Sequence, residues 1–185
     1  MNEAHHDFKY DCTACGQCCE WGGYVCLLAS DVPPLAAHLG LSVQDFVDRY
    51  TRHVTVEYTS SVTIEIVPYL ILKSEGDRCV FLDGKLCKVH EAKPKFCAQS
   101  PITAEFLTDE EGWRVFSEQC PGFGKGRLYD ATQIKEALLR QAQYDDDYEL
   151  ALEHHDWDLG KLLGVSLPEP ELLPDFGVEQ EVEEE

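Results

Sequence analysis

At 185 residues the chain is long enough for one domain with a hydrophobic core and too short for two ordinary domains. Its formal net charge of -20 argues against unaided binding to nucleic acid or an anionic membrane, because phosphate contacts need clustered Lys and Arg. Apolar residues make up 44% of the chain, as in globular proteins, but nine cysteines are more than packing requires. Cysteine chemistry is therefore the feature to explain.

The cellular compartment bears on what those cysteines do. The opening MNEAHHDFKY has neither the basic start nor the apolar stretch of a secretory signal, and no window approaches the roughly 18 consecutive apolar residues of a membrane span. We therefore expect a cytoplasmic protein. Cytoplasmic thiols are kept reduced, which favours metal ligands over a disulfide framework.

The first cysteine cluster, CTACGQCC at residues 12–19, is followed by two predicted short helices. In SDVPPLAAHLG, Ser30 or Asp31 can cap the helix, two prolines lie in its first turn, and Gly40 ends it. Ser42 then caps VQDFVDRYT, whose apolar residues recur at helical spacing. We expect both helices to be packing elements.

Two β-hairpins are predicted from β-branched and alternating sequence. Residues 53–73 indicate two strands around a turn near 59–61, with Pro68 at an edge or bulge of the second strand. The segment ITAEFLTDEEGWRVFSEQC is expected to form a second hairpin that turns at 109–112. Between them, CVFLDGKLCKVHEAKPKFCAQSP is rich in turns and is expected to be irregular apart from a helical turn near His90.

The longest helix is predicted from Asp130, in ATQIKEALLRQAQYDDDYELALEHHDW. Its apolar stripe consists of Ile134, Leu138, Ala142 and Leu150. We expect a break near Asp145 and loose structure beyond Gly160, where prolines and acidic residues accumulate. Residues 145–185 carry fifteen acidic residues against the single Lys161, which is typical of a solvated tail.

These elements predict an α+β fold. We expect a small single domain in which short helices and β-hairpins are organised around a cysteine-ligated metal centre, with a C-terminal helix and an acidic tail. The predicted division is a cysteine-cluster metal-binding domain at 1–128, a helical segment at 129–160 and an acidic, flexible tail at 161–185. Because the metal is part of the core, its loss is expected to unfold the N-terminal half.

The spacing of the first cysteines is specific for metal binding. In Cys12, Cys15 and Cys18, two residues separate neighbouring thiols, so the thiolates can converge while backbone amides point at the sulfurs. Iron–sulfur proteins combine such a run with a remote cysteine that is often followed by proline, as Cys120 is by Pro121.

Basic residues gather around the later cysteines. Four candidates to offset the negative charge of a thiolate-ligated centre are Lys85, Lys88, Lys93 and Lys95. Solvated surface lysines are the alternative explanation for each of them.

A glycine-rich stretch, PGFGKGR, follows Cys120. Its glycines can bring backbone amides close to sulfurs, since glycine adopts positive φ without steric cost. It lacks the spacing of a phosphate-binding loop, so we favour a wrapping or structural loop over an anion site.

The whole pattern resembles the YkgJ-like cysteine-cluster proteins, described as zinc- or iron-chelating domains and recognised by CxxCxxCC near the N-terminus. CTACGQCC matches their first block, CVFLDGKLCKVHEAKPKFC looks like the second and CPGFGKG the third, so the resemblance spans Cys12 to Gly126. It implies a metal- and cofactor-binding ligand set of eight: Cys12, Cys15, Cys18, Cys19, Cys79, Cys87, Cys97 and Cys120. Cys26 is outside that pattern, His90 stands where the family usually has tyrosine, and Lys93 replaces the usual arginine. The family also includes flagellin lysine methylases, but no glycine-rich S-adenosylmethionine motif supports that activity here.

Two residues and one pair of histidines have alternative explanations. Cys26 lies in the apolar run YVCLLA, where core packing in a strand is favoured over metal binding. His90 is either an additional ligand or a turn residue, and the turn is favoured. The pair His5 and His6 either contacts metal or is solvent-exposed near a terminus, and exposure is favoured.

Two functions from different classes follow. The first is a protein whose iron–sulfur cluster, bound by the cysteines, supports redox chemistry or electron transfer, alone or within an enzyme system. The alternative is a zinc-stabilised, non-catalytic module that binds a protein partner. Eight cysteines suffice for two four-thiolate sites, or for one cluster with a second zinc or redox ligands, and the sequence does not partition them. No Ser-His-Asp, Cys-His or paired-carboxylate arrangement stands out, so no catalytic residue is predicted.

Overall fold

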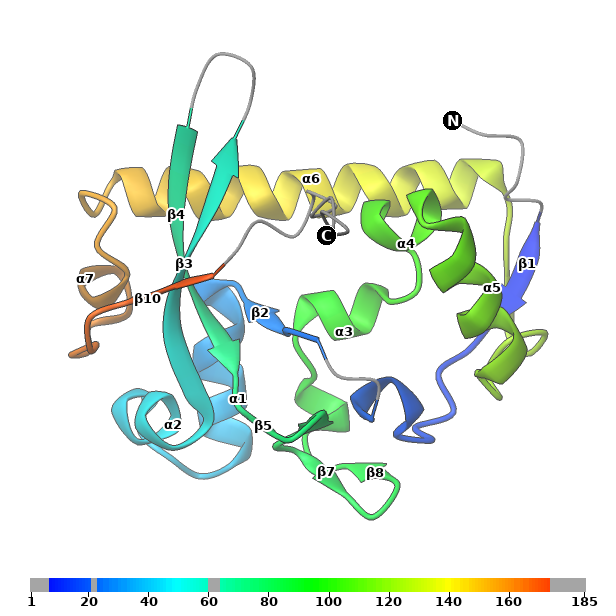
Figure 1. The fold of residues 1–185 in the computed structure, drawn as a ribbon, viewed down its shortest axis with the longest axis horizontal. Coiled ribbons are helices and arrows are strands. Elements are labelled where there is room, and N and C mark those ends of the chain that lie inside the picture. The colour runs from blue at the N-terminus through cyan, green and yellow to red at the C-terminus, as the bar shows by residue number, and fades with distance from the viewer. Residues whose placement is uncertain (1–6, 21–22, 60–63, 174–185) are drawn as a thin grey trace, which may run out of the picture.

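The computed structural model describes residues 7–20, 23–59 and 64–173. The helices are η1 (Gln17–Cys19), η2 (Ala29–Asp31), α1 (Val32–His38), α2 (Val43–Tyr50), η3 (His90–Ala92), α3 (Lys95–Gln99), α4 (Ala104–Thr108), α5 (Glu110–Gln119), α6 (Ala131–Glu153) and α7 (Leu159–Leu163). The strands are β1 (Phe8–Tyr10), β2 (Cys26–Leu27), β3 (Thr51–Thr59), β4 (Ile64–Leu72), β5 (Ser74–Glu75), β6 (Arg78–Cys79), β7 (Leu82–Asp83), β8 (Leu86–Cys87), β9 (Arg127–Tyr129) and β10 (Glu171–Leu173). Short helices and hairpins in one chain confirm the predicted α+β class (Figure 1).

A four-stranded sheet forms one end of the molecule, in the order β10, β3, β4, β2. β3 and β4 pair antiparallel along their lengths, which confirms the first predicted hairpin; residues 60–63 of its connection lie outside the described residues. β2 pairs with β4 at Leu70 and Ile71, and Pro68 lies beyond that stretch, as its predicted edge position requires. At the opposite edge of the sheet from β2, β10 runs parallel to β3.

Side-chain caps start the predicted helices α2 and α6, whereas Asp31 occupies the N-cap position of α1 without a side-chain cap bond. The Ser42 hydroxyl accepts a hydrogen bond from the Asp45 amide at 3.0 Å, at the beginning of α2. At α6, the Asp130 carboxylate accepts from the Gln133 amide at 2.9 Å, and the Gln133 side chain accepts from the Asp130 amide at 3.1 Å. These local signals explain why both helices begin where the sequence predicts.

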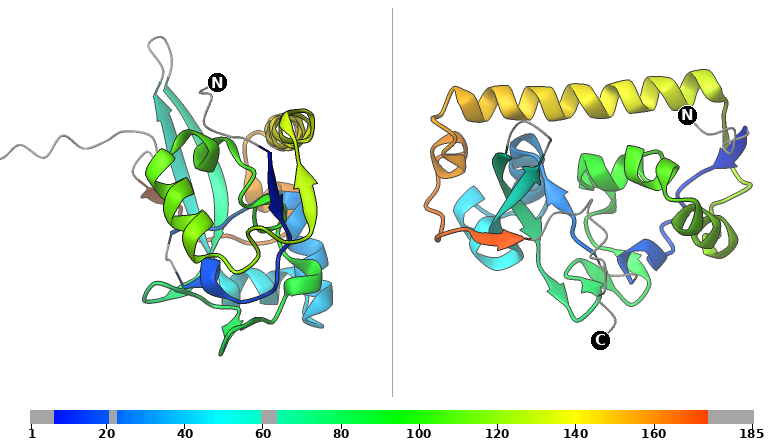
Figure 2. Two further views of the ribbon diagram at one scale, coloured as in Figure 1. Left: turned by 90° about the vertical axis from the view of Figure 1, so that its right-hand side faces the viewer. Right: turned by 45° about the horizontal axis from the view of Figure 1, so that its top comes forward.

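Two hydrophobic clusters are joined by α6. The main core contains Leu27, Val32, Leu35, Ala36, Phe46, Val47, Val67, Leu70, Leu72, Phe81, Val89, Tyr148, Leu152 and Leu159. A smaller cluster is built from Phe8, Ile102 and Ile134, with Trp113 and Phe123 packed on it. Because α6 supplies residues to both clusters, it spans the molecule from the sheet to β1 and α5 (Figures 1 and 2).

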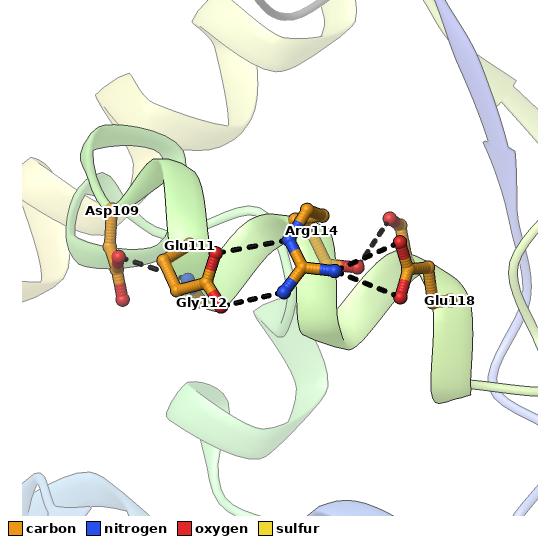
Figure 3. A network of polar contacts seen from close by, with 6 residues as sticks. Asp109, Glu111, Gly112, Arg114 and Glu118 are labelled. Atoms are coloured by element: carbon orange, nitrogen blue, oxygen red, sulfur yellow. Dashed lines mark hydrogen bonds and ion pairs between the residues drawn. The ribbon is translucent and has the colours of Figure 1, made fainter.

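The predicted second hairpin is wrong, because its residues form α4 and α5. The segment DEEG is a helix start rather than a turn: the Asp109 carboxylate accepts from the Gly112 amide at 2.9 Å. One turn later, Arg114 binds Glu111 at 2.6 Å and Glu118 at 3.1 Å, as Figure 3 shows. A cap and two charge pairs along one face therefore favour a helix locally.

The predicted break of the long helix near Asp145 is also wrong, since α6 continues to Glu153. Tyr148 and Leu152 carry the buried stripe past the acidic run, whereas Leu150 is 52% exposed. Within the described ranges, no helix, α6 included, is long and apolar enough to cross a membrane.

The segment after Gly160 differs from the loose structure that we expected. Residues 161–173 include the end of α7 and the strand β10, and Leu173 of β10 is buried against Val54 of β3. Residues 174–185 lie outside the described part of the chain. Pairing with a strand more than a hundred residues earlier is a tertiary contact that local composition does not reveal.

Candidate metal centre

All eight cysteines of the predicted ligand set line one cavity of about 420 Å³. They are Cys12, Cys15, Cys18, Cys19, Cys79, Cys87, Cys97 and Cys120. Much of the remaining wall is apolar: Leu72 and Phe81 come from the main core, and Tyr10 and Phe116 come from the aromatic side around Phe123. Segments far apart in the sequence thus bring their thiols to one place between the two hydrophobic clusters.

A larger, more open depression of about 720 Å³ lies beside α7 and β10. Its wall includes Gln44, His53 and Lys161, and none of the described residues that line it is a cysteine. The donor chemistry, rather than the volume, therefore identifies the cysteine cavity as the candidate site.

Gly16 positions the first cysteine block. It has φ +77°, and a Cβ on it would lie 2.6 Å from the carbonyl oxygen of Lys85. The Gly16 carbonyl accepts a hydrogen bond from the Cys19 amide at 3.0 Å, which closes η1. This close approach packs η1 onto the β7–β8 hairpin, so Cys18 and Cys19 lie near Cys87.

Cys79 and Cys87 are the last residues of two small hairpins, β5–β6 and β7–β8. In each case the backbone amide two residues later donates to the sulfur: Phe81 to Cys79, and Val89 to Cys87. Amide donors of this kind orient a metal-binding thiolate and stabilise its charge. A cysteine that only fills a core has no need of them.

Cys19 is the centre of a group of four thiols. Its side chain forms hydrogen bonds with Cys18, Cys79 and Cys87. These contacts lower the pKa of Cys87 to about 6. They lower the pKa of Cys18 and Cys79 to about 7, and they raise the pKa of Cys19. Lowered pKa values at Cys18, Cys79 and Cys87 suit metal binding, because the thiolate is the ligand.

Cys97 lies in α3 behind this group. Burial raises its pKa to about 12, and the charges of Cys18, Cys79 and Cys87 add to the increase. Lys93 also lines the cavity, and its positive charge acts in the opposite direction on Cys97. Lys93 is therefore placed to offset thiolate charge.

The other three candidate lysines are not among the described residues that line the cavity. Lys88 and Lys95 form ion pairs with aspartates at 3.4 Å, and Lys85 is exposed.

Three further thiols line the cavity: Cys12, Cys15 and Cys120. The Sγ of Cys12 lies 3.6 Å from Nε2 of His90, and the Tyr10 hydroxyl also hydrogen-bonds Cys12. Burial raises the pKa of Cys120, and the charges of Cys15 and Cys18 add to that increase, which places Cys120 near both thiols. Sequence reasoning did not single out Tyr10; its place two residues before the first cysteine was the one available signal.

The glycine-rich stretch after Cys120 is a wrapping loop. The amides of Gly122 and Phe123 donate to the Cys120 sulfur. A Cβ on Gly122 would lie 2.2 Å from the Asp11 carbonyl oxygen, and the Asp11 amide donates to the Gly122 carbonyl at 3.2 Å. The loop therefore fastens the N-terminal segment beside the cavity, as the structural explanation predicts.

The remaining candidate residues lie away from the cavity or outside the described residues. Cys26 is half-buried in β2 and packs against Val54, Ile71 and Leu173, as the core explanation predicts. His5 and His6 lie outside the described residues. None of the nine cysteines, all of which lie in the described ranges, forms a disulfide.

As they stand, no three His, Cys, Asp or Glu side chains of the described residues form a group that can hold one metal ion. Even so, the donor set fits a thiophilic metal, because it combines many thiols with amide donors and a nearby lysine.

The comparison with known families agrees with this chemistry. A family model named CxxCxxCC, with the description "Putative zinc- or iron-chelating domain", matches residues 11–121. The matched range contains every cysteine that lines the cavity. No solved structure gives a significant match. The chain belongs to the CxxCxxCC family, a family of metal-chelating domains described as binding zinc or iron.

Proposed function

We propose that the chain holds one or more iron–sulfur clusters in the cysteine-lined cavity, and that they serve redox chemistry or electron transfer. The eight cavity cysteines are the proposed ligands. One observation carries the proposal: thiols from separate segments of the chain line a single cavity of about 420 Å³.

The size of the cavity favours a cluster over a single ion. In a zinc site, four thiolates bind one ion at about 2.3 Å, and the ion fills the space between the sulfurs. The volume of about 420 Å³ lies instead in the range of roughly 300–1,000 Å³ that proteins use for small molecules and cofactors. An iron–sulfur cluster places iron and sulfide between the thiolates, so it needs more space than a single ion.

The surroundings fit a negatively charged centre that exchanges electrons. When bound, an iron–sulfur cluster would supply one-electron redox chemistry. Backbone amides donate to Cys79, Cys87 and Cys120, and such bonds to sulfur help to set the reduction potential. Cys12 and Cys18 are exposed, so this edge of the centre is the side on which a redox partner can approach.

A zinc-stabilised interaction module is the second candidate, and the contacts of Cys19 favour it. Cys19 contacts Cys18, Cys79 and Cys87, and these four thiols match the ligand number of a closed structural zinc site. Zinc has no redox chemistry, so the protein would then act by presenting its surface to a protein partner.

The cytoplasm is the proposed location, because thiol ligands stay reduced there. We propose residues 1–128 as the metal-binding unit, and the family match over residues 11–121 supports this boundary.

The test is the iron, acid-labile sulfide and zinc content of the full chain purified without oxygen, together with its visible spectrum. Iron and sulfide in matched amounts, with a brown colour that oxygen bleaches, are the expected result. Stoichiometric zinc in a colourless, oxygen-stable protein would overturn the iron–sulfur proposal and favour the interaction module.

A further inference from the structure

The outer face of α6 carries two leucines that the fold leaves uncovered. Leu139 is 61% exposed and Leu150 is 52% exposed. They are eleven residues apart, which is about three helical turns, so they form one line along the helix, the leucine line. The buried residues of α6, Ile134, Tyr148 and Leu152, fall on the opposite side at helical spacing. Figure 2 shows α6 along one margin of the molecule, where a partner can approach this outer face.

The charges beside the leucine line decide whether it is an interface, because single exposed leucines are common on protein surfaces. Lys135 and Glu153 are eighteen residues apart, about five full turns, so both lie on one flank of the line. Glu136 and His154 have the same separation and share the other flank. All four residues are exposed, and none forms an ion pair with another residue that the structure describes. Their polar groups are therefore available to a partner.

The leucines and the flanking residues are arranged symmetrically along α6. The midpoints of the leucine pair and of both flank pairs all fall within residues 144–145. If a two-fold axis passes this point, two copies of α6 run antiparallel, and each contact occurs twice. Leu139 of one copy then faces Leu150 of the other, and Lys135 faces Glu153. On the other flank, the glutamate faces a histidine that can donate a hydrogen bond to it.

The same charges disfavour a parallel pairing of two α6 helices. Each residue would then face its own copy, lysine against lysine and glutamate against glutamate, and like charges repel across an interface. In the antiparallel pairing the acidic run at residues 145–147 comes close to the axis, but on the leucine line Asp146 faces Gln143 of the other copy, which is a neutral amide. Arg140 and Asp147, seven residues apart on one flank, form a further pair of opposite charge across the axis. Charge complementarity thus selects the antiparallel arrangement.

We propose that the outer face of α6 binds the same face of a second copy of the chain, with the two helices antiparallel about a two-fold axis at residues 144–145. Two leucines per copy make a small interface, so we expect dimerisation with a dissociation constant of about 1–100 µM. The dimer does not depend on which metal the cysteine cavity holds, because none of the described residues that line the cavity belongs to α6.

The experiment is sedimentation equilibrium of the full chain, purified without oxygen and kept reduced so that no disulfide links two copies. Across about 1–300 µM, the average mass of wild type should rise from that of one 20.9 kDa chain toward twice that mass. Leu139→Asp and Leu150→Asp should each raise the dissociation constant at least about tenfold, because each places a carboxylate in the centre of the interface. Leu86→Asp is the matched control: Leu86 is 67% exposed but lies in β8, and this variant should dimerise like wild type.

Charge reversals test the pairing itself. Lys135→Glu places glutamate against glutamate, and Glu153→Lys places lysine against lysine, so each variant alone should dimerise about tenfold more weakly than wild type. Mixed in equal amounts, the two variants should dimerise with each other about as tightly as wild type, because both contacts then join opposite charges. Glu75→Lys and Lys85→Glu make the same changes of net charge at exposed positions outside α6, so each should dimerise like wild type and gain nothing from mixing.

A wild type that stays monomeric up to about 300 µM would overturn the dimer. So would Leu139→Asp and Leu150→Asp variants that are folded by circular dichroism and dimerise like wild type, because another surface would then join the two copies. Two weakened charge variants that fail to dimerise when mixed would overturn the antiparallel pairing.

Discussion

Gly16 offers the sharpest test of how the first cysteine block is positioned. In Gly16→Ala the new Cβ would meet the Lys85 carbonyl oxygen at 2.6 Å and Cδ1 of Leu82 at 2.7 Å. The left-handed conformation at φ +77° costs a residue with a Cβ about 1–2 kcal/mol, and a forced contact in a packed region costs about 1–3 kcal/mol more. We expect a total loss of about 2–5 kcal/mol, together with displacement of η1 and weaker metal binding.

Gly40→Ala is the matched control. Gly40 has φ +68°, and no heavy atom lies within 4 Å of the place that a Cβ would take, so it carries the conformational cost without the clash. The entropy that alanine removes from the unfolded chain is the same in both variants and cancels in the comparison. The difference between the two losses should therefore be about 1–3 kcal/mol, the cost of the contact with Lys85.

The assay is urea unfolding at fixed free metal concentration, followed by circular dichroism, with bound metal measured in parallel. If Gly16→Ala loses no more stability than Gly40→Ala and keeps its full metal content, the packing of η1 on the β7–β8 hairpin does not position the cysteines.

Three other predictions follow from the same contacts. Cys19→Ser should lose metal from the group that it centres, whereas Cys26→Ser should keep the full metal content, which elemental analysis measures; equal losses would contradict the assignment of Cys26 to the core. Tyr148→Phe should lose about 0.5–1.5 kcal/mol at neutral pH, because the Tyr148 hydroxyl donates to the Pro68 carbonyl at 2.6 Å. Burial raises the pKa of Tyr148, so its contribution is complete below the unfolded pKa of about 10 and declines at higher pH; a stability profile of Tyr148→Phe that falls as steeply as wild type above pH 10 would contradict this. Metal removal by a chelator should speed amide hydrogen exchange in residues 11–20 while β3 and β4 stay protected, and uniform exchange behaviour before and after removal would refute a structural role for the metal.

Local signals in the sequence predicted those parts of the fold that local contacts determine. Ser42 and Asp130 cap α2 and α6 at the expected positions. Asp109 shows the limit of such signals, because aspartate followed by Glu-Glu-Gly suits a turn as well as a helix start, and only the helical neighbours decide between them. The pairing of β10 with β3 joins distant segments and has no local signal at all.

The candidate site shows the same division between local and tertiary information. The CxxCxxCC spacing and the order of the later cysteines identified the residues that line the cavity. The spacing did not reveal the grouping, because Cys18 and Cys19 both turn toward Cys79 and Cys87 only after the two small hairpins have folded. The contact between His90 and Cys12 likewise depends on η3 and the N-terminal loop meeting in space.

X-ray absorption at the iron edge, on the full chain purified without oxygen, tests the central claim most directly. The account predicts iron with sulfur neighbours only in its first coordination sphere and a clear iron–iron distance beyond it, as in a cluster held by thiolates and sulfide. Iron surrounded by oxygen and nitrogen without an iron neighbour, or a protein that contains zinc and no iron, would contradict it.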